Sequence, residues 1–186
     1  QEFGALNPFC FFADHHTDLA PLVHSGRLQF LSQFPGMDDP QIRSLIPSPC
    51  EIETVKAATL DPAINDSKIK ALFRDLIQLR KNTPAFSAQR SDGVTGAVLG
   101  ERAFVLRFFE GQDDRLLLIN LGPELSVSAS EPLLAPVAGT VWNPVWNSSQ
   151  SEYGGEGILQ IERETGWVLP GQCAIVCRPI SAPVPD

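Results

Sequence analysis

Residues 102–122 read RAFVLRFFEGQDDRLLLINLG, and this stretch decides the fold of the second half of the chain. Two apolar runs, 102–109 and 115–122, flank a five-residue segment of Glu, Gly, Gln and two Asp. β-Branched and aromatic residues favour strands, whereas Gly and Asp favour tight turns. The stretch therefore predicts a β-hairpin whose turn lies at 110–114.

Further short apolar runs on both sides of this hairpin are separated by Gly, Pro, Asp and Asn. They are AVLG at 97–100, LSVSA at 125–129, VWNPVW at 141–146, ILQIE at 158–162 and CAIVCRP at 173–179. Many short strands at this spacing are typical of antiparallel sandwiches. We expect residues 85–186 to form an antiparallel β-sandwich domain.

A helix precedes the strands. In DSKIKALFRDLIQLRKNT, residues 66–83, the apolar side chains recur every three or four positions, which places them on one face of an amphipathic helix. Asp66 is a suitable N-cap, Arg80 and Lys81 suit the negative C-terminal end, and Pro84 ends the pattern.

The first 64 residues are less regular. A weaker helix is expected within 16–34, capped by Thr17 or Asp18, with Leu19, Leu22 and Val23 facing inward and Gly26 as a possible interruption. Residues 35–64 are rich in Pro and Asp and predict an irregular connection. The fold class is therefore α+β, with a helical part at 1–84 and a β-sandwich at 85–186.

Composition narrows the function classes. The 186 residues carry 43% hydrophobic and 19% charged side chains, which fits a globular protein, and a formal net charge of −8. That charge argues against nucleic acid and anionic membranes as partners, because both need a basic surface. The apolar runs are too short to cross a bilayer. We expect an acidic, soluble protein with a neutral partner.

The four Cys predict neither disulfides nor a metal site. Cys173 and Cys177 alternate along one strand and would lie about 13 Å apart, too far to bridge. The sequence has no CxxC motif and no Cys/His spacing that suits zinc. We expect reduced thiols in a cytoplasmic protein, without metal or cofactor.

The opening segment, QEFGALNPFCFFADHH (1–16), carries a family resemblance. QEFG followed by NPFCFFADH resembles the segment after the eighth barrel strand of alpha-amylase-family glycoside hydrolases. The stretch PFCFFADH together with the later SGRLQF is most similar to the corresponding stretch of maltooligosyltrehalose trehalohydrolases. The resemblance continues through IPSPCEIETVKAATLDP, LFRDLIQLRKNTPAF, VWNSSQSEYGG and LPGQCAIVCRP, in the family's order.

The resemblance implies that this chain is the C-terminal part of a larger enzyme. Residues 1–84 would be the end of a (β/α)8 barrel, with 66–83 as its last helix, and 85–186 the C-terminal domain. The family's three catalytic carboxylates lie on barrel strands four, five and seven, and no position here matches them. We therefore expect no catalytic residue and no activity in this chain alone, while the parent would hydrolyse an α-1,4 bond to release trehalose.

Asp14 and His15 are the candidate substrate-binding residues. In a barrel enzyme the loop after strand eight faces the active site, so these side chains could bond sugar hydroxyls. The opposing interpretation is that Phe9, Phe11 and Phe12 are barrel core and that the polar residues are plain surface. Both interpretations stay open on the sequence.

Two other functions compete with the enzymatic one. A stand-alone carbohydrate-binding or structural sandwich could use Trp142 and Trp146, which are four residues apart, although Pro144 should break the strand between them. A branching or debranching enzyme of the same superfamily is the other alternative. Without a barrel, the aromatics of 1–34 would form an apolar patch and favour self-association.

Overall fold

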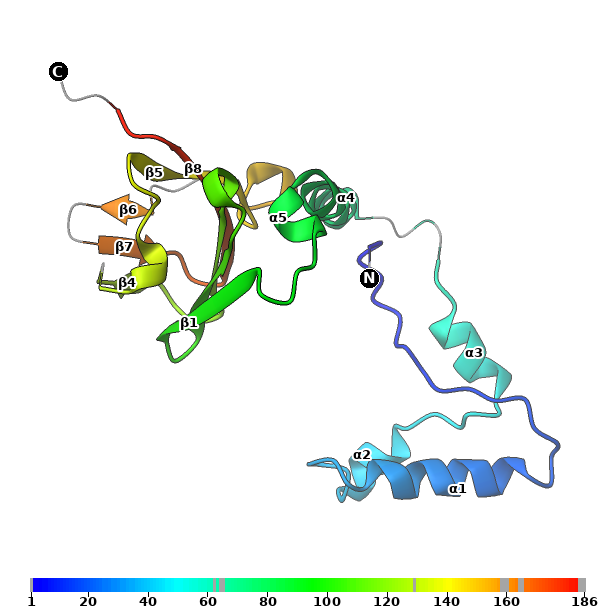
Figure 1. Ribbon diagram of the computed structural model, residues 1–186. Coiled ribbons are helices and arrows are strands. Elements are labelled where there is room, and N and C mark those ends of the chain that lie inside the picture. The colour runs from blue at the N-terminus through cyan, green and yellow to red at the C-terminus, as the bar shows by residue number, and fades with distance from the viewer. Residues whose placement is uncertain are drawn as a thin grey trace. The chain divides into compact units, whose positions relative to one another are not determined.

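The computed structural model describes residues 2–61, 63, 66–128, 130–157, 161–163 and 166–183 (Figure 1). The chain divides into two compact units, Gln1–Asp66 and Ser67–Asp186. It combines helices with antiparallel sheets, as the α+β expectation requires. From Ser67 onward, the predicted helix 66–83 lies in the same compact unit as the sheets. The predicted domain boundary between 84 and 85 separates a barrel segment from the C-terminal domain in the parent enzyme, and it stays a prediction.

The described residues of the first unit form the helices α1 (Ala20–Leu31), α2 (Pro40–Ser44) and α3 (Ile52–Ala58). The expected irregular connection therefore holds two short helices. Asp39 caps α2, since its Oδ1 accepts a hydrogen bond from the Gln41 amide at 2.8 Å. Among the described residues of this unit only Pro49 and Thr54 are buried, so the unit has almost no core.

Helix α1 differs from its prediction in three ways. Its N-cap is Leu19, without a side-chain cap, so neither Thr17 nor Asp18 serves; Pro in the first turn lowers the need for one, because it has no N–H to satisfy. Gly26 does not interrupt the helix, since one Gly costs only about 1 kcal/mol. Leu19 and Leu22 are exposed rather than inward-facing, because the apolar residues of α1 form no single stripe.

The second unit begins with α4 (Ser67–Asn82) and α5 (Pro84–Ser87). The periodic apolar stripe of 66–83 is thus confirmed as one continuous helix, with Arg80 and Lys81 in its last turn. No helix among the described residues is both long and apolar enough to span a membrane.

In the described part of the chain, eight strands and three short 3-10 helices follow. The strands are β1 (Val94–Gly100), β2 (Ala103–Phe108), β3 (Arg115–Asn120), β4 (Leu125–Val127), β5 (Thr140–Asn147), β6 (Glu162–Arg163), β7 (Gly166–Leu169) and β8 (Cys173–Ser181). The 3-10 helices are η1 (Gly111–Asp113), η2 (Pro132–Leu134) and η3 (Ser151–Tyr153). The predicted hairpin is confirmed: β2 and β3 are antiparallel, Phe108 pairs with Arg115, and η1 forms the turn.

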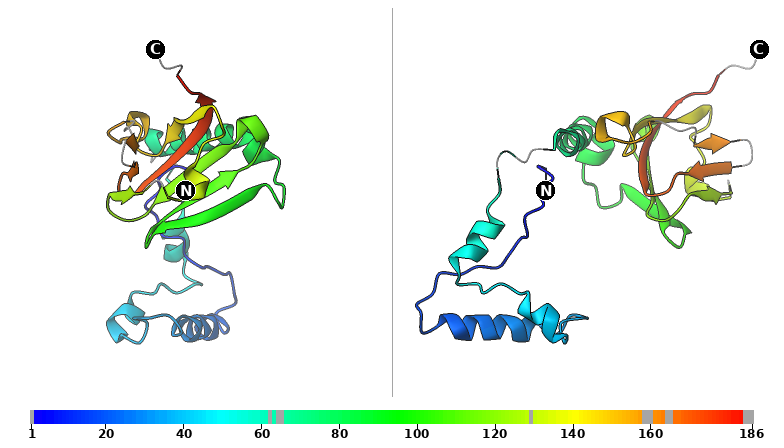
Figure 2. Two further views of the ribbon diagram at one scale, coloured as in Figure 1. Left: turned by 60° about the vertical axis from the view of Figure 1, so that its left-hand side comes forward. Right: turned by 180° about the vertical axis from the view of Figure 1, so that it is seen from behind.

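The strands form two antiparallel sheets. One has the order β1-β2-β3-β8-β5 and the other the order β4-β7-β6 (Figures 1 and 2). The predicted strand ILQIE lies mostly outside the described residues. β7 was not predicted, because a four-residue strand that begins with Gly gives little signal.

The two sheets enclose one hydrophobic core. The five-stranded sheet contributes Val105, Leu116, Leu118 and Ile175, and the smaller sheet contributes Trp167 and Leu169; all six are at most 4% exposed. Cys173 and Cys177 lie in the same core, so the expectation that both are buried is confirmed.

Candidate functional site

Asp14 and His15 lie in the extended segment that precedes α1, and both are exposed. Backbone and side-chain hydrogen bonds hold this segment beside α3: the Ala13 amide donates to the Pro49 carbonyl at 2.9 Å, and Asn7 Nδ2 donates to the Ala57 carbonyl at 3.2 Å (Figure 1). The fold therefore fixes the backbone next to the two residues and leaves their side chains to solvent.

The aromatic residues around them are exposed too. Phe9 is 106% exposed, and Phe11 and Phe12 are 51% exposed. The Arg27 guanidinium lies over the rings of Phe11 and Phe30, at 5.3 and 5.4 Å from their centroids. Arg27 therefore makes cation–π contacts with two of the exposed rings of this unit.

The tryptophans of the sheet unit do not form a sugar platform. Trp142, Trp146 and Trp167 are 5%, 8% and 4% exposed. Sugar stacking needs an accessible ring face, so the exposed Trp pair of the binding-module hypothesis is absent from the described residues.

Pro144 explains why the two tryptophans of β5 separate. Opposite β8, Trp142 pairs with Pro179 and Trp146 with Val176, so the ladder shifts by one residue between Pro144 and Trp146. A bulge of one residue reverses which face the following side chains occupy. Trp142 accordingly joins the core between the sheets, and Trp146 lies on the opposite face of the larger sheet.

On that opposite face, α4 and the larger sheet enclose an apolar cleft of ≈ 510 Å³. Its lining is apolar except for one guanidinium, and comprises Leu76, Leu79, Arg80, Phe86, Phe108, Leu117, Ile119, Trp146, Ala174 and Val176. A chain of hydrogen bonds begins at Trp146 in this lining: Trp146 Nε1 donates to the Tyr153 hydroxyl at 3.1 Å, and that hydroxyl donates to Asp75 Oδ2 at 2.8 Å. This network joins α4 to η3 and β5.

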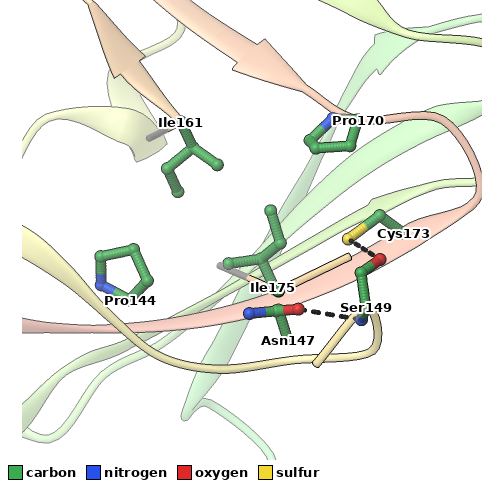
Figure 3. A pocket seen from close by; sticks show the side chains of 8 residues that line it. Pro144, Asn147, Ser149, Ile161, Pro170, Cys173 and Ile175 are labelled. Carbon is green, nitrogen blue, oxygen red and sulfur yellow. Dashed lines mark hydrogen bonds between the residues drawn. The ribbon is translucent and has the colours of Figure 1, made fainter. Parts of the chain in front are cut away.

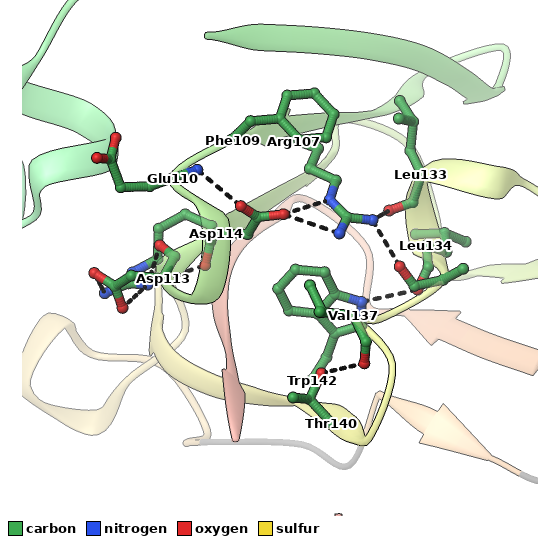
Figure 4. Close-up of polar contacts among 12 residues, drawn as sticks. Arg107, Phe109, Glu110, Asp113, Asp114, Leu133, Leu134, Val137, Thr140 and Trp142 are labelled. Carbon is green, nitrogen blue, oxygen red and sulfur yellow. Dashed lines mark hydrogen bonds and ion pairs between the residues drawn. The ribbon is translucent and has the colours of Figure 1, made fainter. Parts of the chain in front are cut away.

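A second polar cluster ties β2 to the hairpin turn and to η2 (Figure 4). Arg107 donates from Nε and Nη2 to Asp114 Oδ2, at 3.0 and 2.9 Å, and from Nη1 to the Ala135 carbonyl at 2.6 Å. Asp114 Oδ1 accepts from the Glu110 amide at 2.8 Å. Both charged side chains are nearly buried and fully engaged with protein partners, so the cluster is structural rather than catalytic.

The small pocket near Cys173 is also unsuited to a ligand (Figure 3). Its cavity measures ≈ 10 Å³, and Ser149 Oγ donates to the Cys173 sulfur at 3.5 Å. Room for one water at most excludes a sugar. Within the described residues, no three His, Cys, Asp or Glu side chains cluster as a metal site would require.

Sequence reasoning missed both polar networks. Asp75 and Tyr153 are separated by 78 positions, and no local pattern could pair them. Arg107 precedes the predicted hairpin turn, and Asp114 is the last residue of that turn, seven positions later. Opposite charges at the two ends of the turn were therefore a usable signal.

The chain is similar to one described family and to several known proteins. Residues 91–176 match the family described as Domain of unknown function (DUF3459). Malto-oligosyltrehalose trehalohydrolase of Deinococcus radiodurans is 29% identical over 137 residues, which are 72% of this chain and 22% of that protein. A Salmonella typhimurium protein described as an alpha-amylase superposes on 95% of this chain and 26% of its own, with a TM-score of 0.64 and 21% identity. The chain resembles the C-terminal part of alpha-amylase-family enzymes.

A more distant structure has the same fold. Trehalose-6-phosphate hydrolase of Bacillus licheniformis superposes on 96% of this chain and 34% of its own, with a TM-score of 0.53 and 13% identity. This chain therefore spans about a quarter of the length of the first two relatives and a third of this one.

Proposed function

We propose that this chain is the C-terminal part of an alpha-amylase-family glycoside hydrolase that releases trehalose from maltooligosyltrehalose. The observation that carries the proposal is the similarity to malto-oligosyltrehalose trehalohydrolase over 72% of the chain. The segment PFCFFADHH followed by SGRLQF, which resembles the same enzymes, supports it.

The proposal gives each part of the chain a role in the parent enzyme. Residues 1–84 are the end of the catalytic barrel, with α4 as its last helix, and the two sheets are the C-terminal β-sandwich. Hydrolysis proceeds by retaining double displacement, which needs two carboxyl groups about 5 Å apart across the scissile bond. Those carboxyl groups belong to the barrel of the parent, because no residue here matches them.

Within that enzyme Asp14 and His15 bind hydroxyls of the α-glucan substrate. Their exposure supports this assignment, as does the resemblance of their segment to the loop after the last barrel strand, which faces the active site in barrel enzymes. In the parent, Asp14→Ala and His15→Ala should lower kcat/KM by about ten- to a hundredfold, the loss of about 1–3 kcal/mol of polar contacts. The melting temperature should stay unchanged, and wild-type kinetics in both variants would contradict the assignment.

The test of the function compares this chain with its parent. The chain alone, incubated with maltooligosyltrehalose or soluble starch, should give no product above a denatured control. The parent should release trehalose from maltooligosyltrehalose far faster than it cleaves maltoheptaose. Turnover by the chain alone, or a parent indifferent to the trehalose end, would overturn the proposal.

The same assays separate the competing functions. A branching or debranching parent would change α-1,6 linkages in amylopectin and release no trehalose. A stand-alone binding module would instead be retarded in a maltoheptaose affinity gel without any parent activity.

The location and the partners follow from the proposal. The parent is cytoplasmic, needs no cofactor or metal, and binds neither nucleic acid nor membrane. If its barrel is removed, the aromatic surface at Phe9, Phe11 and Phe12 is a site of self-association, because these rings are exposed.

A further inference from the structure

The edges of the two sheets differ in how they are protected. Sheet edges expose unpaired backbone groups, and natural proteins shield them with short strands, Pro, bulges or charge. β4 and β6 have three and two residues, and β5 carries Pro144 and a bulge. β1 has seven residues, VTGAVLG, without charge or Pro, and Val98 on it is 79% exposed. Figure 2 (left) shows β1 as the outermost strand of the larger sheet.

The regular part of this edge is Val94–Val98, because the register with β2 shifts between Val98 and Gly100. The Phe109 amide donates to the Gly93 carbonyl at 2.9 Å, so Gly93 directs its backbone groups toward β2. Along an antiparallel ladder this direction alternates. Val94, Gly96 and Val98 therefore direct their N–H and C=O groups outward, to the free edge.

This five-residue edge is complementary to itself. Two copies related by a two-fold axis at Gly96 would pair antiparallel, with Val94 of each copy opposite Val98 of the other. The outward-facing residues then exchange N–H···O=C bonds, and no side chain lies at the axis. The strand is also uncharged in a chain of net charge −8, so this contact avoids the repulsion that most other surfaces would meet.

We propose that β1 binds β1 of a second copy through this edge, forming a closed two-fold dimer with one continuous antiparallel sheet. Strand addition at a sheet edge is a known mode of association, in which backbone hydrogen bonds give affinity and side chains give register. A two-fold contact of this kind closes on itself and stops at two copies.

The test measures the mass of the full chain in solution by sedimentation velocity over a range of concentrations. The wild-type chain should dimerise. V94K/V98K should weaken the dimer about tenfold or more, because like charges then lie opposite each other across the axis. V94K/V98E should recover most of that loss, because each introduced cation then faces an introduced carboxylate. If the two β1 strands paired in another register, positions 94 and 98 would not lie opposite each other, and V94K/V98E would not recover the dimer.

Two control variants locate the contact. L121K changes a side chain that is 66% exposed at the end of β3, and F9E changes the N-terminal aromatic surface. L121K should dimerise like the wild type, and F9E should lose only the self-association through Phe9 and keep the dimer formed by β1. Melting curves should show that every variant is folded. A wild type that is monomeric at every concentration overturns the proposal, as does an F9E chain that is monomeric or a dimer that V94K/V98K does not weaken.

Discussion

Tyr153 holds one hydroxyl between two partners that lie far from it in the sequence. It accepts a hydrogen bond from Trp146 Nε1 and donates one to Asp75. The hydrogen bond from Tyr153 holds the pKa of Asp75 below its usual 3.8, and burial, then the bond to Asp75, raises the pKa of Tyr153 above 10.0. The network is therefore strongest when Asp75 is ionised and Tyr153 is neutral.

Tyr153→Phe should lower the stability of the sheet unit by about 1–2 kcal/mol, because the indole N–H and the carboxylate each lose a partner. The melting temperature should fall by about 2–8 °C, measured by circular dichroism at pH 7. Ser151→Ala, two residues before Tyr153 in η3, is the matched control and should melt like the wild type.

The same network predicts how the effect depends on pH. Asp75 has a lowered folded-state pKa, so its contribution is present above 3.8 and is lost as pH falls through the lower folded value. Tyr153 has a raised folded-state pKa, so its contribution is present below 10.0 and is lost as pH rises through the higher value. The difference between wild type and Tyr153→Phe should be largest between these limits, and a difference that is constant from acid to alkali would contradict this.

Prediction from sequence was weakest at this scale. Asp14 and His15 were selected by their place in a motif that resembles a family, and the structure leaves both exposed. The pairing of Tyr153 with Asp75 depends on how α4 lies over β5, which is tertiary geometry without a local signal.

At the scale of elements, one ion pair connects three segments of the chain. Arg107 on β2 binds Asp114, which directly precedes β3, and the Ala135 carbonyl, which follows η2 (Figure 4). The side chains of Arg107 and Asp114 are 11% and 4% exposed. Removal of either partner would leave a buried unpaired charge and lower the free energy of unfolding.

Asp114→Ala should therefore cost about 3–5 kcal/mol, because the guanidinium of Arg107 stays buried without a carboxylate. Chemical unfolding followed by tryptophan fluorescence measures this cost, since Trp142 lies beside the pair. Arg107→Met combined with Asp114→Leu should recover much of the loss. If Asp114→Ala costs under about 1 kcal/mol, the pair behaves like a surface salt bridge.

The elements that the sequence predicts well are those with a strong local pattern. The stripe of α4 and the hairpin of β2 and β3 combine periodicity with turn residues, and both are confirmed. α2 and α3 were missed because Pro and Asp dominate their surroundings, although Asp39 before Pro40 is itself a helix start signal. The sequence predicts that Pro144 breaks the regularity of the strand between the two tryptophans. That Trp146 lies on the opposite face of the sheet from Trp142 follows only from the register with β8.

At the scale of the whole chain, the two units differ in what holds them together. The sheet unit has a core shared by both sheets, whereas the described residues of Gln1–Asp66 bury only Pro49 and Thr54. Burial of apolar side chains is the main favourable term in folding, at about 1.5–3 kcal/mol for each large residue. The sheet unit should therefore carry nearly all the stability of the chain.

Deleting residues 1–64 should accordingly leave a folded protein that unfolds cooperatively, with a melting temperature close to that of the whole chain. This deletion retains Asp66 and the whole of α4, which covers the outer face of the larger sheet together with α5. Circular dichroism and calorimetry on the truncated chain measure both properties.

Deleting residues 1–83 is the matched comparison, because it also removes α4. Leu117, Ile119 and Val176 would then lose the helix that packs over them, and Trp146 would lose the hydrogen-bond chain to Asp75. A large apolar surface exposed in this way favours aggregation. We expect this shorter chain to melt at lower temperature and to aggregate. If instead the deletion of 1–64 is already unfolded, residues 1–64 are part of the core, and α4 belongs with them rather than with the sheets.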